Sequence, residues 1–211
     1  MSEIGYNPRA GRYVYTDTKR FVPQAVIQSL REQEERRLEV RLQAHTRLLA
    51  SGKLHLAEWQ LRMGESLRDL HLRTMTLAAG GKDRLTAQHY GAAGYQLRRQ
   101  FEYLDGFARS LHAGNLTEKQ ALTRAAMYAS SIRVTFGRSE QISRATEGFA
   151  QAMRGLDAGA NHCPDCIDHV TEGWVSLELI VTPGTNCSCR QRCRCWVRYR
   201  RVNLSRRLPA A

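Results

Sequence analysis

Six cysteines gather in a short stretch near the C-terminal end of the chain. They lie between Cys163 and Cys195, and the residues before Cys163 include no cysteine. The first two, Cys163 and Cys166, form a C-x2-C pair whose thiolates can hold one side of a tetrahedral metal ion. The second half-site, Cys189, Cys193 and Cys195, begins after a gap of about 22 residues, and Cys187 is a further thiol beside it.

This pattern predicts a structural zinc site. Zn²⁺ favours four soft ligands supplied in pairs, and a closed four-thiolate site leaves no open position for a catalytic water. A tight C-x-C pair rarely donates both sulfurs to one ion. The six thiols can therefore be ranked by how strongly each is expected to be a ligand. The expected ligands are, in order, Cys163, Cys166, Cys193 and Cys189, with Cys195 and Cys187 as alternates. A module of about 40 residues has a small apolar core, so metal binding would supply much of its folding free energy.

Disulfides and free thiols are the alternatives to zinc. The first residues, MSEIGYNPRAGRY, lack a basic segment followed by an apolar run, so export to an oxidising compartment is not expected. A thioredoxin-like role for Cys163 and Cys166 is not expected either, because no βαβ pattern surrounds them. His162 and His169 flank the pair, and we expect them to be surface residues since six thiols already suffice.

The charge of the chain favours a polyanionic partner. It has 32 Lys and Arg against 20 Asp and Glu, a formal net charge of +12. Trp196 and Tyr199 lie among C-terminal arginines, a combination that suits phosphate contact and base stacking. The arginines expected to contact nucleic acid are Arg190, Arg192, Arg194, Arg198, Arg200, Arg201, Arg206 and Arg207. The alternatives are a solvated basic tail and a contact with an acidic protein surface.

Most of the chain before the cysteines has a helical pattern. Apolar residues recur every three to four positions, and glycines or serines separate the segments. The expected helices cover residues 23–50, 56–79, 86–113 and 117–155, with a kink at Gly137 in the last. Residues 31–37 (REQEERR) are all polar, so this stretch of the first helix is either solvated or lies against a charged partner.

The remaining segments complete the predicted organisation. Residues 1–22 form an N-terminal arm with a hairpin over residues 12–22, residues 23–155 a helical domain, and residues 156–211 a cysteine-rich zinc-binding module with a basic tail. Residues 174–181 are β-like. We therefore expect a mainly α fold, a helical bundle with long helices followed by a small zinc-ribbon-like β module. No segment approaches the roughly 18 apolar residues of a membrane span.

Catalytic signatures are missing from the sequence. It contains no P-loop, no G-x-G-x-x-G, no H-E-x-x-H and no G-x-S-x-G motif. A nuclease that used the cysteine and histidine region would need an open metal position and a general base, and the sequence offers no clear candidate. We therefore do not expect an enzyme.

The order of the C-terminal motifs resembles a known family. A C-x2-C pair at 163–166, Gly173-Trp174-Val175, Pro183-Gly184 and a terminal C-x-C at 193–195 resemble the C-terminal region of tailed-phage head morphogenesis proteins, also called minor head proteins. Residues 6–14 and 56–60 are similar to segments of phage proteins of this kind. The family's second half-site commonly reads H-P-N-C-R-C, whereas residues 190–195 read R-Q-R-C-R-C. This departure leaves the fourth ligand open.

The resemblance implies a structural virion protein without catalytic activity. Such proteins occur in few copies, associate with the portal vertex and the capsid interior, and assist head assembly or DNA entry. The implied partners are the portal or major capsid protein, packaged DNA and further copies of the chain around the vertex, with no membrane. The implied location is the virion, and the host cytoplasm during assembly. The alternative is a free zinc-ribbon protein that binds nucleic acid through its basic tail.

Overall fold

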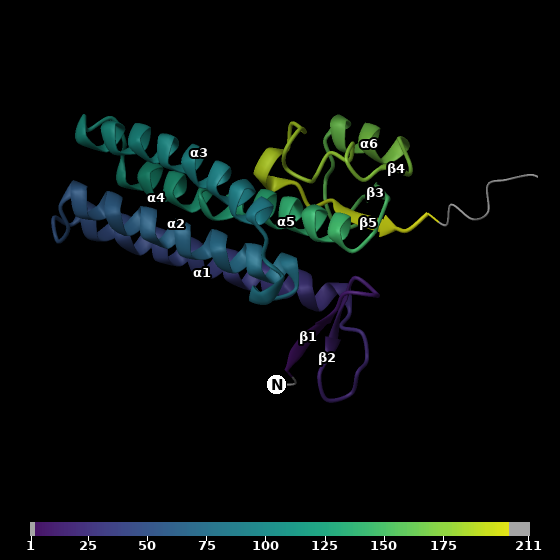
Figure 1. Cartoon of the computed structure of the whole chain (residues 1–211). Helices are drawn as coiled ribbons and strands as arrows, with labels where there is room; N and C mark the ends of the chain where they lie inside the picture. The colour runs from purple at the N-terminus through teal and green to yellow at the C-terminus, as the bar shows by residue number, and fades with distance from the viewer. Residues whose placement is uncertain (1–2, 203–211) are drawn as a thin grey trace, which may run out of the picture.

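The computed structural model describes residues 3–202. Its long helices lie side by side in an elongated bundle, and α5 runs between this bundle and a small C-terminal module (Figure 1). The helices are α1 (Gln24–Ala50), α2 (Leu56–Ala79), α3 (Ala87–His112), α4 (Glu118–Met127), α5 (Ile132–Thr146) and α6 (Pro164–Thr171). The strands are β1 (Ile4–Asn7), β2 (Arg12–Tyr15), β3 (Gln151–Gly155), β4 (Val175–Ser176) and β5 (Trp196–Arg200). The predicted fold class, a helical bundle followed by a small β module, is confirmed.

The apolar repeat of the helices builds the bundle core as predicted. Trp59, Met63 and Leu67 of α2 are fully buried, one helical turn apart. The Trp59 ring meets Phe107 of α3 edge-on, with ring centroids 5.1 Å apart. Phe107 in turn stacks over Tyr128, which follows α4, at 6.1 Å. These rings join three helices into one core. No helix in the described part of the chain is long and apolar enough to cross a membrane.

The helix ends follow their predicted signals at most positions. Gly80 ends α2 with φ of +85°, a left-handed conformation that glycine adopts without steric cost. Thr117 caps α4: its side chain accepts a hydrogen bond from the backbone N–H of Gln120.

The predicted kink at Gly137 is wrong. The break falls earlier, at the 3₁₀ turn η2 (Ala129–Ser131), and Gly137 lies inside a continuous α5. A Cβ atom at Gly137 would lie 3.3 Å from Cβ of Thr182. This glycine therefore allows the C-terminal module to approach α5 closely.

The helix expected to run to about Gly155 ends at Thr146. Gly148 has φ of +78°, and the backbone N–H of Phe149 donates to the carbonyl of Arg144, which closes the helix. The chain then forms β3, which pairs antiparallel with β4 on one side and β5 on the other. The C-terminal sheet therefore includes residues that the helical spacing had assigned to the bundle.

Two further strand predictions need correction. The β-like segment 174–181 pairs over Val175–Ser176, a much shorter strand than predicted. Conversely, β5 forms within the segment that we expected to be a basic tail. Its partner β3 lies about 45 residues earlier in the chain, so no local signal identifies the pairing.

The N-terminal hairpin forms, with a different first strand from the one expected. β1 pairs with β2, whereas the predicted return segment contributes one isolated bridge, Val14 to Phe21. Tyr6 of β1 reaches the C-terminal end of α5, where its hydroxyl donates to Oε1 of Glu147, the residue that follows the helix, at 2.7 Å. The hairpin therefore packs on the helical body of its own chain.

The polar stretch at residues 31–37 lies against charged partners in the same chain. Its acids face arginines of α2, of α5 and of the segment before β5. The ion pairs are Glu34–Arg73 (3.6 Å), Glu35–Arg133 (2.9 Å) and Glu32–Arg194 (3.8 Å). Of the two predicted environments, the structure shows the charged partner.

Candidate metal centre

The structure brings all six cysteines into one cluster. The sulfurs of Cys163, Cys166, Cys187 and Cys189 all lie within 4.8 Å of one another. The sulfurs of Cys166, Cys193 and Cys195 form a second such group. Cys166 belongs to both groups, and its side chain is fully buried. The cluster can hold a metal ion.

Local turns present the sulfurs to one another. Pro164 occupies the first position of α6, where its fixed φ suits a helix start, so Cys163 and Cys166 flank the first turn. In the other half, the backbone N–H of Arg190 donates to the carbonyl of Cys187 at 2.8 Å, and that of Cys193 donates to Arg190 at 3.0 Å. Arg190 itself has φ of +46°. These turns bring the two C-x-C pairs, 187–189 and 193–195, close to α6.

The spacing of the sulfurs fits metal ligands. Sulfur atoms are 3.5 Å apart between Cys166 and Cys189, 3.6 Å between Cys166 and Cys193, and 3.4 Å between Cys187 and Cys189. The edges of a tetrahedral zinc–thiolate site are about 3.8 Å, given Zn–S bonds of about 2.3 Å. A disulfide needs about 2.05 Å, and all six cysteines are free thiols.

A buried arginine supports a charged state of this cluster. Arg154 of β3 is 1% exposed, and its Nη2 donates to the sulfurs of Cys166 (3.5 Å) and Cys193 (3.3 Å). Its Nη1 donates to the carbonyl of Val181, and no ion pair joins it to a carboxylate in the described residues. A buried guanidinium requires a negative partner. Thiolates held deprotonated by a metal ion provide one.

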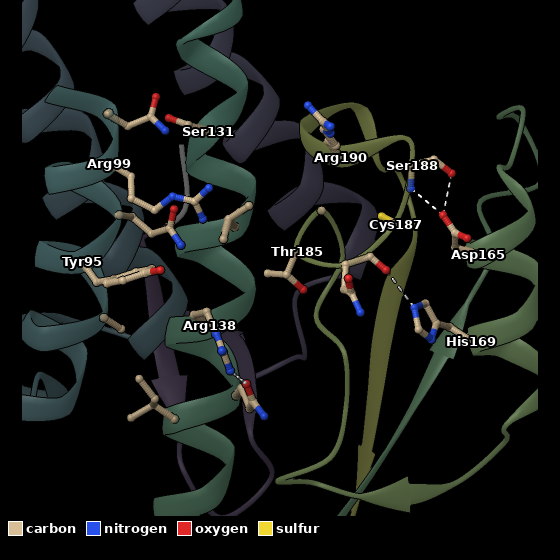
Figure 2. A pocket seen from close by; sticks show the side chains of 18 of the residues that line it. Tyr95, Arg99, Ser131, Arg138, Asp165, His169, Thr185, Cys187, Ser188 and Arg190 are labelled. Carbon is tan, nitrogen blue, oxygen red and sulfur yellow. Dashed lines mark hydrogen bonds between the residues drawn. The ribbon is translucent and has the colours of Figure 1, made fainter. Parts of the chain in front are cut away.

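The environment of Cys163 also favours a thiolate. Burial opposes ionisation, but hydrogen bonds from the backbone of Cys189 and Cys166 outweigh it and lower the pKa of Cys163 to about 6. The neighbouring loop is tied to α6 because the backbone N–H and hydroxyl of Ser188 both donate to Oδ2 of Asp165, at 2.6 and 2.5 Å (Figure 2). The fit between the donor set and a thiophilic ion such as zinc is therefore both geometric and electrostatic.

The grouping of the sulfurs differs from the predicted order. Cys187, ranked as an alternate, completes the four-sulfur group with Cys163, Cys166 and Cys189. Cys193, ranked third, lies in the other group with Cys195. The two sulfurs of each C-x-C pair fall within one group.

Two residues that contact the sulfurs, His162 and Arg154, were not predicted as part of the site. His162 was expected at the surface, yet its Nδ1 lies 3.8 Å from the sulfur of Cys195. Arg154 fell within a predicted helix and carried no signal. His169, by contrast, bonds to the carbonyl of Asn186 and to Glu172 and holds α6 to the loop before the second cysteine group.

The C-terminal arginines are exposed where the structure describes them. Arg198 and Arg200 of β5 lie over the rings of Trp196 (4.6 Å) and Trp174 (4.3 Å), on the outer face of the sheet. Arg201 donates to the carbonyl of Glu147, and Arg194 also pairs with Asp157 at 3.5 Å. The other exposed members of the predicted set are Arg190 and Arg192. Arg206 and Arg207 lie outside the described residues.

A cleft of about 1330 Å³ separates the helices from the module (Figure 2). Tyr95, Arg99 and Arg138 line its helical wall, and Asp165 and His169 line the opposite wall. Several of these polar groups already have partners: Arg138 bonds to Gln141 and His169 to the Asn186 carbonyl. The helical wall carries arginines, whereas the opposite wall carries Asp165 together with Arg190.

No family model matches the chain, and no curated protein or solved structure matches it either.

Proposed function

We propose that the protein is a structural component of a tailed-phage head without catalytic activity, placed near the portal vertex or the capsid interior. Its zinc-stabilised module makes non-specific contact with DNA and assists head assembly and packaging. The observation that carries this proposal is the outer face of the sheet, where Arg198 and Arg200 are exposed and lie over tryptophan rings. The same module contains the cluster of six thiols. The phage assignment itself comes from the resemblance of the cysteine motif.

Zinc in this proposal has a structural role. Cys163, Cys166, Cys187 and Cys189 would hold it, and the bound ion would cross-link α6 to the loop before β5. Four thiolates close the coordination shell and leave no position for a reacting water. Arg154 offsets the negative charge of the site from inside the module.

The arginine face suits phosphate contact without base reading. Guanidinium groups bind phosphate oxygens in pairs of hydrogen bonds, and such contacts carry no sequence information. The outer face consists of strand residues, with no helix presented to a DNA groove. Binding through it should therefore be equal for unrelated sequences and steeply salt-dependent.

Exposed aromatic side chains on two sides of α3 are available for protein partners, and two of them, Tyr95 and Tyr103, line the cleft. α3 exposes four large aromatic side chains along its length, each at least 38% exposed. They are Tyr90, Tyr95, Phe101 and Tyr103. Exposed aromatics are enriched at protein interfaces. In the proposal this helix meets the portal protein, the major capsid protein or another copy of the chain.

Neutralising three arginines of the module should reduce DNA binding. In Arg192→Gln with Arg198→Gln and Arg200→Gln, we expect the slope of log affinity against log salt to fall by about 2.7, at about 0.9 per lost phosphate contact. Fluorescence anisotropy with two labelled duplexes of unrelated sequence measures it. The matched control removes three exposed arginines of the bundle, Arg47, Arg68 and Arg109, and should keep the wild-type slope. An equal loss in the control would refute the proposed DNA face.

Association with phage heads tests the structural role. Heads are sedimented from a lysate of the source, washed in high salt and analysed by mass spectrometry. We expect the protein to remain at low copy number, because protein contacts resist salt better than phosphate contacts do. Release into the soluble fraction would instead support the alternative, a free zinc-ribbon nucleic-acid-binding protein, which the exposed arginines of β5 also favour.

A further inference from the structure

One metal ion leaves part of the thiol cluster unexplained. If it binds the four-sulfur group, Cys193 and Cys195 remain buried, each 4% exposed, next to the sulfur of Cys166. The Cys166 and Cys193 sulfurs are 3.6 Å apart, the same spacing as within the first group. Cys166 therefore lies at a vertex common to two sets of sulfurs. A thiolate has more than one lone pair and can bridge two metal ions.

His162 offers a fourth donor to the second set from the side of Cys195. Its ring must move closer to Cys166 and Cys193 to complete a site, because only the three sulfurs lie within 4.8 Å of one another. Its Nε2 lies 2.7 Å from the carbonyl oxygen of Asp157, to which it can donate its proton. The unprotonated Nδ1 then faces the sulfur of Cys195 at 3.8 Å. A ring nitrogen anchored on a backbone carbonyl, with the other nitrogen free, is the usual arrangement of a metal-ligating histidine.

We propose that the module holds two thiophilic divalent ions, such as zinc, with Cys166 as the bridging ligand. One ion binds Cys163, Cys166, Cys187 and Cys189. The other binds the three grouped sulfurs of Cys166, Cys193 and Cys195, and His162 moves in beside Cys195 as the fourth ligand. Each ion then has the four-ligand shell of a closed structural site. The inference goes beyond the single structural ion of the proposed function and does not depend on a phage role.

The charge around the second ion is consistent with this arrangement. Six thiolates and two divalent ions leave a net charge of −2, and Arg154 is the buried cation that contacts both Cys166 and Cys193. N–H groups that donate to ligand sulfurs are typical outer-shell partners of metal sites. The rival arrangement has Arg154 as the sole cation beside Cys193 and Cys195, with one metal ion in the whole cluster.

The number of metal ions per chain decides between the two arrangements. The full chain is reconstituted with Zn²⁺ under reducing conditions, and bound zinc is counted by native mass spectrometry and elemental analysis. We expect two ions in the wild-type protein and one in Cys195→Ser. The control His169→Ala should retain two, because that histidine bonds to Asn186 and Glu172 and not to a sulfur. ¹¹³Cd substitution should give two resonances coupled through the Cys166 sulfur.

One zinc ion per wild-type chain would overturn the proposal and favour the rival arrangement. Two ions that persist in Cys195→Ser would also overturn the ligand assignment. The wild-type count needs no variant, so misfolding of Cys195→Ser does not affect it. Absence of the protein from phage heads would leave the count unchanged, which separates this test from that of the proposed function.

Discussion

Replacing Cys163 and Cys166 by serine is expected to unfold the C-terminal module. The apolar core of this module is small, with Ala152, Leu177 and Ile180 as its buried members apart from the cysteines. Structural zinc contributes roughly 10–16 kcal/mol to the folding of small domains, far more than so few apolar side chains can supply. Without both thiolates of the first pair, we expect the module to lose its metal and its fold.

Limited proteolysis with mass spectrometry measures this effect. The wild-type module should resist cleavage, whereas the double variant should be cleaved within residues 156–202 and leave a resistant helical fragment. Chelation of the wild-type protein should give the same pattern, and added Zn²⁺ should reverse it in the wild type but not in the variant. An unchanged cleavage pattern, with no bound metal in either protein, would contradict a structural ion.

Unfolding of the module should loosen α5 but should not unfold the rest of the bundle. Nε2 of Gln141 donates to the carbonyl of Leu177 at 2.8 Å, and the hydroxyl of Tyr199 lies 3.3 Å from Glu140. Loss of the module removes both contacts from α5. The same helix also packs on α2 and α3, which do not depend on the module. We therefore expect local loosening of α5 while the bundle remains folded.

Local signals were sufficient to predict the long helices. Trp59, Met63 and Leu67 repeat at helical spacing, and Gly80 and Thr117 mark helix ends by their own chemistry. Each of these signals acts within one or two turns of the chain. A prediction that rests on local conformation is therefore reliable for such segments.

The strands of the module depend on contacts that no local pattern records. Phe149 and Met153 continue the helical spacing, yet Gly148 ends the helix and β3 forms instead. In β5, Val197 and Tyr199 alternate with arginines as a half-buried strand requires, but the pairing with β3 decides the structure. Because the segment is rich in arginine, we predicted a basic tail there and did not recognise the alternation of a strand.

The six thiols of the cluster were predicted from the sequence, but their grouping was not. The spacing identified the six thiols, but the division between Cys187 and Cys193 depends on the turn at Arg190, whose positive φ folds the loop back. The role of Arg154 could not be predicted from the sequence for a different reason. A buried arginine becomes recognisable when its anionic partners are placed around it, which requires the three-dimensional structure.

Trp59→Ala is expected to destabilise the bundle by about 3–5 kcal/mol, the usual cost of deleting a large buried aromatic side chain. Trp59 is fully buried, and its indole N–H donates to Oγ1 of Thr46 at 3.2 Å. Its edge contact with Phe107 is lost as well. Trp59→Phe retains most of the apolar volume, so we expect a smaller loss of about 1–2 kcal/mol. Urea unfolding followed by circular dichroism at 222 nm measures both.

Metal content provides the control for Trp59→Ala. Trp59 belongs to the bundle core, whereas the six thiols form a separate cluster in the module. At urea concentrations that leave the variant folded, we expect it to bind as much zinc as the wild-type protein. A loss of zinc under those conditions would show that the bundle and the metal centre fold as one cooperative unit. In that case, removing the first thiol pair should also lower the urea midpoint for unfolding of the helices. The coupling would then run through α5, because Gln141 and Glu140 of this helix contact the module.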